Sequence, residues 1–382
     1  MEKRILIFAY GDMNRNPRPR RQLEWLMNRF EVEYIGNIAN PDLSAHFIEH
    51  KTKVGLISKY RLFLLKLRLY NVYIWDQCNR ALASQLMDRT YDIILVHHIK
   101  LLPIVFRFGR NAKIIFDAHE YYTEMYNDSP IWNFFMKDFY TWISENYLKK
   151  CNLTIAVNES MQHLYERNFH IPATFITSAS NYVALQPSHV DPNNIKIIHH
   201  GLASVSRKLE LMIEIAKYLD DRFTLTIILF EINYTSRRYV KKLKKLAKEN
   251  KRVIFLEVMP QNELINNCNA YDIGLFFMPP SNMNEEFSLA NKFFQYVQSR
   301  LALAVSPLPE MKRLVEKYDL GIVGHNYDPK AMAEKLNRLT PEKIMYYKTR
   351  CNESAKELSS ESNKDKFRKI VADVLRQEEN GN

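Results

Sequence analysis

The stretch "DIGLFFMPPSNMNEEFSLANKFFQYVQSRLALAVS" (residues 272–306) contains the pattern that decides the fold. It opens with an apolar run at 272–278, continues through a polar loop and closes with a second apolar run at 301–306. Between the loop and the second run, residues 288–300 have the spacing of apolar and polar side chains that is typical of an amphipathic helix. The sequence therefore predicts a strand, a helix and a second strand, which is the unit from which parallel sheets are built.

The same alternation continues along the rest of the chain. Apolar and aromatic runs typical of buried strands occur in one series at 4–10, 91–98, 112–118 and 153–157, and in a second series at 195–201, 223–230, 252–258, 272–278 and 301–306. Longer amphipathic stretches separate these runs, so the predicted fold class is α/β.

The two series are separated by the polar segment 185–194, which contains Pro187 and Pro192. Such a segment favours a loop, so we place the domain boundary there. We expect two doubly wound, Rossmann-like domains that face each other across a cleft. The predicted divisions are an N-terminal Rossmann-like domain at 1–185, a C-terminal Rossmann-like domain at 195–360, and a C-terminal amphipathic helix and tail at 361–382.

The composition indicates a folded protein that needs an anionic partner. The 382 residues are 46% hydrophobic and carry a formal net charge of +11. Nucleic acid is disfavoured, because the basic residues are scattered and no helix-turn-helix or RNP-like signal accompanies them. The four cysteines have no metal-ligand spacing, and no apolar run approaches the roughly 20 residues of a membrane span. We therefore expect a cytoplasmic protein that binds phosphate-bearing small molecules or a membrane surface.

The predicted helix at 288–300 has an unusual polar face. Ser288, Asn291, Lys292, Gln295 and Ser299 recur at the spacing that puts them on one side. One interpretation is a solvated face. The other is a phosphate site, because the helix follows a strand and its N-terminus lies at the carboxyl edge of the sheet. Free backbone N–H groups, the helix dipole and an ammonium group would meet there.

A resemblance favours the second interpretation. "DIGLFFMPP" followed by "FSLANKFFQYVQSRLALAVSPLPEM" resembles the donor-binding segment of retaining glycosyltransferase family 4. That segment is often written S-L-P-N-K-x-F-E-Y-M, and the family has the GT-B fold. Weaker similarities lie in "GLASVSRKLE" (201–210), "FDAHE" (116–120) and "AVNES" (156–160). The resemblance implies that Lys292 and Arg207 neutralise the diphosphate of a nucleotide sugar. Ser288 and Asn291 would support it, and Lys208 would share the role of Arg207.

Two positions depart from the family pattern. Gln295 stands where the family has a ribose-binding glutamate, and Phe287 replaces the glutamate eight residues earlier. An amide can still exchange hydrogen bonds with ribose hydroxyls, but it brings no charge.

In the first domain, the resemblance makes His119 of "FDAHE" a candidate for contacting the transferred sugar or the departing phosphate, with Glu120 beside it. A lone histidine is otherwise more often structural. His97 and His98 end the preceding strand, and we expect one of them to face the same site. No carboxylate or cysteine completes a ligand set with recognisable spacing, so we expect no metal and no cofactor.

The segment "AYGDMNRNPRPRRQ" (9–22) corresponds to a loop that lines the acceptor side in the family. Its arginines suit an anionic acceptor, and they are Arg15, Arg18, Arg20 and Arg21. The alternative is a basic loop that leads into a surface helix.

Two basic amphipathic segments remain. Residues 59–73 combine large apolar side chains with Lys59, Arg61, Lys66 and Arg68, which suits a helix lying on an anionic membrane. A core helix with a charged outer face is the alternative. Residues 236–252 are rich in lysine, and a solvated face accounts for them.

Together these features predict a GT-B glycosyltransferase of the metal-independent hexosyltransferase type. It would move a sugar, with retention, from a nucleotide diphosphate sugar to a glycan or lipid-linked acceptor in surface polysaccharide or glycoconjugate synthesis. The protein would be cytoplasmic, or peripheral at the inner face of the membrane. Two alternatives remain: a non-catalytic nucleotide-sugar or carbohydrate-binding protein of the same fold, and a nucleotide-sugar 2-epimerase.

Overall fold

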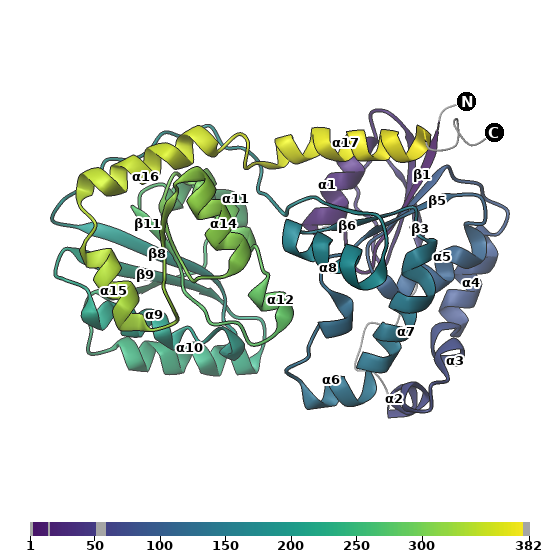
Figure 1. Cartoon of the computed structure of the whole chain (residues 1–382), viewed down its shortest axis with the longest axis horizontal. Helices are drawn as coiled ribbons and strands as arrows, with labels where there is room; N and C mark the ends of the chain where they lie inside the picture. Colours follow the sequence, from purple (N-terminus) through teal and green to yellow (C-terminus); the bar gives the residue numbers. More distant parts are fainter. Residues whose placement is uncertain (1–2, 14–15, 51–58, 377–382) are drawn as a thin grey trace. The chain divides into compact units, whose positions relative to one another are not determined.

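A computed structural model describes residues 3–13, 16–50 and 59–376 (Figure 1). The chain divides into two compact units. The first comprises Met1–Thr177, Asn282–Asn284 and Lys364–Asn382, and the second comprises Ser178–Ser281 and Glu285–Asn363. Each unit has its own parallel sheet.

The sheet of the first unit has seven strands in the order β3-β2-β1-β4-β5-β6-β7, and all described pairings are parallel. The strands are β1 (Arg4–Phe8), β2 (Glu31–Gly36), β3 (His46–Glu49), β4 (Ile93–Val96), β5 (Lys113–Asp117), β6 (Leu153–Ala156) and β7 (Ala173–Phe175). The helices are α1 (Pro17–Leu26), α2 (Lys59–Lys66), α3 (Tyr70–Ile74), α4 (Gln77–Leu86), α5 (Leu102–Phe108), α6 (Pro130–Phe135), α7 (Lys137–Tyr147) and α8 (Glu159–Phe169).

The second unit repeats the same topology with six strands in the order β10-β9-β8-β11-β12-β13. Its strands are β8 (Ile195–Leu202), β9 (Phe223–Phe230), β10 (Val253–Leu256), β11 (Ile273–Phe276), β12 (Ala302–Val305) and β13 (Gly321–Val323). The later helices are α9 (Glu210–Tyr218), α10 (Tyr234–Ala247), α11 (Gln261–Cys268), α12 (Met283–Glu286), α13 (Asn291–Gln298), α14 (Pro309–Tyr318), α15 (Pro329–Asn337) and α16 (Pro341–Ser354).

The last described helix, α17 (Ser360–Arg376), brings the end of the chain back to the first unit. Its side chains Phe367, Val371 and Val374 are buried in the core beneath α1, and the Phe367 ring lies 5.6 Å from the Trp25 ring. Figure 1 shows α17, in yellow, beside α1. The apolar spacing of this helix therefore reflects packing onto the first sheet.

All of the predicted strands are present, and the two-domain α/β prediction is confirmed for each unit taken by itself. The sequence analysis missed β2, β3, β7 and β13. The prediction of one helix over 59–73 is wrong, because α2 ends at Lys66 and α3 begins at Tyr70. Arg68 between them has a φ of +56°, a left-handed conformation that cannot continue a helix.

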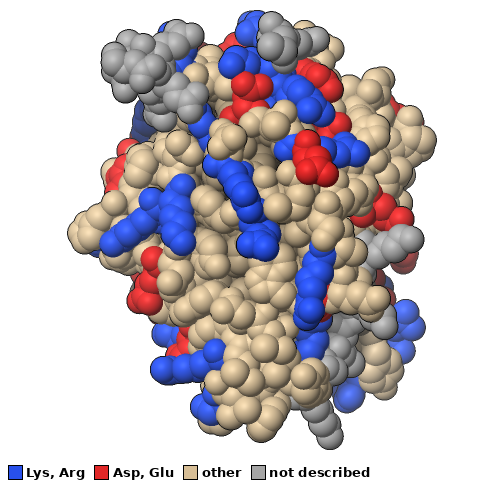
Figure 2. All heavy atoms as spheres, turned by 90° about the vertical axis from the view of Figure 1, so that its right-hand side faces the viewer, with Lys and Arg blue, Asp and Glu red and all other residues tan. Residues whose placement is uncertain are grey.

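Basic side chains are spread over the surface instead of forming one stripe. Figure 2 looks at the first unit from the side that lies to the right in Figure 1, and Lys and Arg appear there in several separate places. In the second unit, the lysines of α10 are exposed, while Tyr239, Val240 and Leu243 are buried beneath them. The lysine-rich segment is thus a solvated helix face.

Candidate functional site

Both sheets have a switch point, at which the strand order reverses direction. In the second unit this point lies between β8 and β11, which pair in the middle of the sheet. Ligands of open parallel sheets bind beyond the carboxyl ends of the strands at this point. The predicted donor residues should therefore gather where β8 and β11 end.

Lys292 lies there, in the first turn of α13. Its side chain is buried, with 8% of the residue's surface exposed, and Nζ lies 5.5 Å from the centroid of the Phe276 ring at the end of β11. The other side of the ammonium group is formed by Gly201 of β8, at which a Cβ atom would overlap Lys292 Cε and Nζ. Gly201 also has a φ of +146°, which disfavours any other residue.

The ammonium group of Lys292 has no acidic partner and no hydrogen bond among the residues that the structure describes. Burial, and to a lesser extent the charge of Arg207, lower the pKa of Lys292 to about 7. A buried cation without a partner is costly, so it indicates a place where an anion binds.

Arg207 lies at the end of a short 3-10 turn, η4 (Val205–Arg207), that follows β8. Its side chain is partly buried, and burial lowers its pKa, while the charge of Glu285 opposes that change. Glu285 itself accepts hydrogen bonds from the backbone and the hydroxyl of Ser281. Lys208 is exposed and has a φ of +44°. The structure thus brings Arg207 close to Lys292, with Lys208 on the surface.

Two histidines that the sequence analysis treated only as strand residues belong to this cluster. His199 donates from Nδ1 to the Leu275 carbonyl over 2.9 Å, and Nε2 of both His199 and His200 is buried without a hydrogen-bond partner among the residues that the structure describes. Burial, and then the charge of Lys292, lower the pKa of His200 to about 3 and that of His199 well below its ordinary value. Both rings are therefore neutral at pH 7 and add no further charge. The signal in the sequence was the pair "HH" at the end of a predicted strand.

The other residues of the predicted donor site take different positions. The helix begins at Asn291, so the prediction that Ser288 lies in its first turn is wrong. Ser288 is in the preceding loop, and its Oγ is buried without a hydrogen-bond partner in the described part of the chain. Asn291 is exposed, whereas Gln295 is partly buried. Phe287 is also partly buried.

The solvated-face interpretation of this helix does not fit its burial. Lys292 is buried, and Ser299 is buried with its Oγ donating to the Ile265 carbonyl over 2.9 Å. Of the predicted polar face, Lys292 thus serves an interior site and Ser299, directly after α13, a structural hydrogen bond, while Asn291 is exposed.

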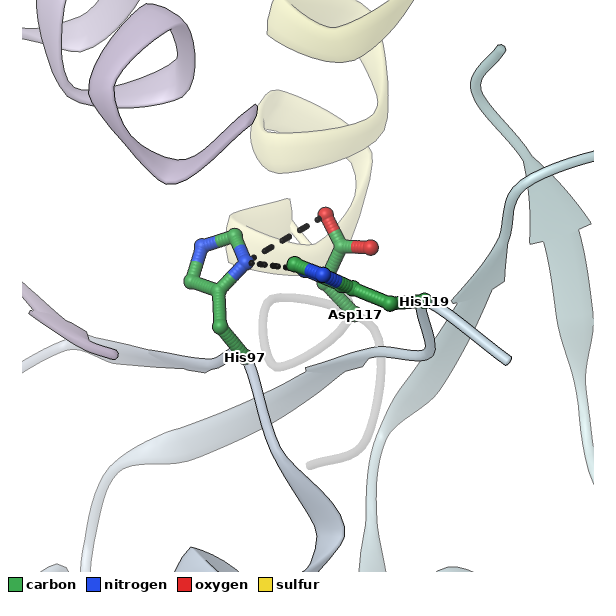
Figure 3. A group of neighbouring side chains, drawn as sticks. All are labelled: His97, Asp117 and His119. Carbon is green, nitrogen blue, oxygen red and sulfur yellow. Dashed lines mark hydrogen bonds and ion pairs between the residues drawn. The ribbon is translucent and has the colours of Figure 1, made fainter. Parts of the chain in front are cut away.

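The first unit contains a second cluster, near the carboxyl ends of β4 and β5. His97 follows β4, Asp117 ends β5, and His119 lies two residues later. Nδ1 of His97 lies 3.1 Å from Nε2 of His119 and 3.8 Å from Oδ2 of Asp117. Figure 3 shows the two rings and the carboxylate converging. Of the two candidates in "HH" at 97–98, His97 is therefore the one that meets His119.

The carboxylate of Asp117 is already paired. Arg18 donates from Nε to both carboxylate oxygens, at 2.8 and 3.1 Å, and Gln22 donates to Oδ2. Arg18 also donates to the carbonyl of Ile176 over 2.7 Å. Burial by itself would raise the pKa of Asp117, but the charge of Arg18 and the electrostatic interactions with His97 and His119 lower it. Arg18 is thus held inside the first unit.

The other arginines of the acceptor-side prediction differ from Arg18. Arg20 is on α1, where its Nε lies 2.8 Å from the Glu24 carboxylate one turn later. Arg15 lies outside the described residues. The segment from Pro17 onwards is therefore the start of a helix, and an acceptor contact by these arginines stays a prediction.

The cluster in Figure 3 includes a carboxylate that sequence spacing did not reveal. Ligand atoms of His97, Asp117 and His119 all lie within 4.8 Å of one another. Such a set is compatible in type with a metal ion. However, the guanidinium group of Arg18 already occupies the carboxylate, and a divalent cation would have to compete with it. The donor set therefore fits a metal poorly, and metal independence stays a prediction.

Glu120 follows His119 and is partly buried. Its Oε2 is buried and has no hydrogen-bond partner among the described residues. Burial raises the pKa of Glu120 to about 7. Burial also lowers the pKa of His119 to about 4, which Asp117 opposes and Arg18 reinforces. At neutral pH, His119 is thus neutral and Glu120 is near its titration point.

Comparison with known proteins identifies the fold. No family model matches the sequence, and no curated protein matches it. Solved structures do match. Sucrose-phosphate synthase from Thermosynechococcus elongatus has a TM-score of 0.72 and 13% identity, and the match covers 98% of this chain and 99% of that one.

Two further structures extend the comparison. An alpha,alpha-trehalose 6-phosphate synthase from Burkholderia multivorans has a TM-score of 0.63 and 13% identity, with 98% of both chains covered. HepE from Anabaena, in complex with UDP and glucose, has a TM-score of 0.67 and 12% identity, with 97% of this chain and 100% of that chain covered. At these identities the likeness shows the fold, and the fold is GT-B.

Proposed function

We propose that this chain is a glycosyltransferase that transfers a sugar from a nucleoside diphosphate sugar. The observation that carries the proposal is the buried ammonium group of Lys292, which has no anionic partner in the described part of the chain and lies at the switch point of the second sheet. Arg207 and the N-terminus of α13 lie close to it. Together they supply the positive charge and N–H donors that a departing diphosphate requires.

In the proposed reaction, the bond between the anomeric carbon and the diphosphate oxygen breaks, and the acceptor oxygen bonds to the same carbon. For a retaining enzyme similar to glycosyltransferase family 4, both events occur on one face of the sugar, and the acceptor proton passes to the departing phosphate oxygen. Lys292 and Arg207 would stabilise the charge that develops on the phosphate. Ser288 and Asn291 would add hydrogen bonds, and Gln295 would contact the ribose.

The first unit would supply the residues for the sugar and the acceptor. We propose that neutral His119 donates or accepts a hydrogen bond at the transferred sugar and that Glu120 contacts an acceptor hydroxyl. The acceptor would be a glycan or a lipid-linked sugar in polysaccharide or glycoconjugate synthesis in the cytoplasm. No side-chain nucleophile is assigned, and no metal is expected to be needed.

The experiment begins with a thermal-shift panel of UDP-, GDP-, ADP- and CMP-sugars, since a ligand that binds the native state raises the Tm. HepE was solved with UDP and glucose, so UDP-glucose is the first member to test. The ligand that binds is then labelled in its sugar and incubated with candidate acceptors. Transfer of label is expected. Absence of binding by every member of the panel would contradict the proposal.

A second candidate function is a non-catalytic nucleotide-sugar binder. It is favoured by one observation, which is the replacement of the two family glutamates by Phe287 and Gln295. A Tm rise with no transfer to any acceptor, and no hydrolysis of the donor, would favour the binder.

A further inference from the structure

The first unit exposes large apolar side chains on two neighbouring helices, α2 and α6. Between 51% and 70% of the surface of each of five residues is exposed, and they are Tyr60 and Phe63 of α2, Leu67 directly after α2, and Ile131 and Phe134 of α6. The two helices are in contact, and Nζ of Lys66 lies 3.7 Å from the centroid of the Phe134 ring. Figure 1 shows both helices at the lower end of the first unit. We refer to these five residues as the α2–α6 patch.

The patch residues are not the side chains with which α2 and α6 pack against the rest of the first unit. Leu64 and Leu65 of α2 and Trp132 of α6 are buried and supply the packing of both helices. Exposed apolar side chains are ordinary when they occur singly. Five of them, on two adjacent helices and the residue that follows α2, form a surface that calls for a partner.

The charges around the patch are basic on the α2 side. Residues 59–73 contain no acidic residue. Arg68, just beyond α2, is exposed and forms an ion pair with the exposed Asp138, at 3.0 Å. At the lower end of Figure 2, the surface is mainly tan and blue, with little red. On the α2 side, the cations Lys66 and Arg68 thus lie next to aromatic and aliphatic side chains, an arrangement that complements a negatively charged surface with an apolar interior.

We propose that the α2–α6 patch attaches the chain to the surface of an anionic lipid bilayer. None of the described helices has the length and apolar content to cross a bilayer, so the attachment would be superficial. The aromatic rings and leucine would enter the interfacial layer, and Lys66 and Arg68 would remain at the level of the lipid phosphates. The surface differs from the single helix that the sequence suggested, since Ile131 and one of its three aromatic rings, that of Phe134, come from α6. The inference does not depend on the proposed function, because the patch shares no residue with the donor cluster.

The test is co-sedimentation of the full chain with vesicles of phosphatidylcholine alone and of phosphatidylcholine mixed with phosphatidylglycerol. At low salt, we expect binding to the anionic vesicles only. Replacing both rings (Phe63→Ser with Phe134→Ser) should reduce the partition coefficient by about tenfold or more. Replacing both charges (Lys66→Gln with Arg68→Gln) should reduce it by about tenfold and weaken its salt dependence.

The control is a matched pair of exposed lysines on α10 (Lys241→Gln with Lys245→Gln), which lie outside the patch. This variant should bind vesicles as the wild type does. Calorimetric Tm values check that each variant folds, and the four residues substituted in or next to the patch, Phe63, Lys66, Arg68 and Phe134, are exposed. Arg61 is left intact because it pairs with Asp76 at 2.9 Å and lies against the Tyr73 ring.

Three outcomes would overturn the proposal. They are equal binding to neutral and anionic vesicles, no binding to either, and an equal loss of binding in the α10 control. The mass of the chain in solution is measured alongside by light scattering. A dimer that dissociates in the Phe63→Ser, Phe134→Ser variant, without vesicle binding by the wild type, would identify the partner as a second copy of the chain.

Discussion

The two units each bury a cationic side chain near the carboxyl edge of a parallel sheet, but the surroundings of the two cations differ. Arg18 of the first unit is paired with Asp117 and donates to a backbone carbonyl. Lys292 of the second unit lies among Gly201, the Phe276 ring and neutral histidines, without an anion in the described part of the chain. A buried charge with an internal partner contributes to structure, whereas one without a partner indicates a ligand.

The first test of this comparison replaces, one at a time, two buried lysines of the second unit: Lys348, which is paired, and Lys292, which has no acidic partner among the described residues. Lys348 is the matched control for Lys292, because it is fully buried but pairs with Asp272 at 3.2 Å and donates to Tyr271 O at 2.9 Å. We expect Lys292→Met to lower turnover by about a hundredfold to a thousandfold, since a charge-stabilising group is lost. Lys348→Met should keep turnover per folded molecule but lower the Tm.

The two substitutions should also have opposite effects on the stability of the protein. The pKa of Lys292 is lowered from 10.5 to about 7, so the buried ammonium costs stability at any pH below 10.5, and the cost is fully present below pH 7. Lys292→Met should therefore raise stability at pH 7 by about 1–2 kcal/mol, and the gain should vanish as the pH approaches 10. Scanning calorimetry at several pH values measures it. A Tm that falls in Lys292→Met would mean that the lysine is structural.

The second prediction concerns the paired cation. Arg18→Met leaves the Asp117 carboxylate buried without its main partner, so it should destabilise the first unit by about 3–5 kcal/mol. All four tryptophans, Trp25, Trp75, Trp132 and Trp142, lie in the first unit, so tryptophan fluorescence during urea unfolding reports that unit alone.

The control measurement for Arg18→Met is nucleotide-sugar binding at a temperature at which the variant is folded. Binding should remain close to that of the wild type. Unchanged stability with a loss of binding would reverse the roles that we assign to the two units.

The smallest expected effect is at Gln295. If its amide contacts the ribose, Gln295→Glu should strengthen nucleotide binding by about threefold to tenfold, because a charged acceptor makes a stronger hydrogen bond with a hydroxyl. Calorimetric titration of wild type and variant with the same nucleotide sugar gives the ratio. Identical affinities for every nucleotide would place Gln295 away from the ribose.

Much of the fold could be predicted from the sequence, because long apolar runs such as 223–230 and 195–201 are buried strands. The strands that were missed lack this signal. Glu31 and Glu33 break the apolar pattern of β2, and the buried carboxylate of Glu33 accepts hydrogen bonds from Arg4, Arg89 and Tyr91. The strand β13 has only three residues.

The candidate site was less predictable, because residues far apart in the chain form it. The resemblance identified Lys292 and Arg207, which the structure places close together. Nothing in the local sequence indicated that Arg18 would pair with Asp117, or that His199 and His200 would lie beside Lys292. The end of the helix at Lys66 also has no local signal, since Arg68 carries the left-handed turn without a glycine.

The most direct test of the central claim is the proton uptake that accompanies donor binding. At pH 8, a lysine with a pKa of about 7 is mostly neutral, and a diphosphate beside it would raise that pKa and draw in a proton. Calorimetric titration with the binding nucleotide sugar, in two buffers of different ionisation enthalpy, measures the uptake. We predict a substantial fraction of a proton, up to about one, per ligand for the wild type and almost none for Lys292→Met. Binding by the wild type without proton uptake would contradict the claim that Lys292 holds the diphosphate.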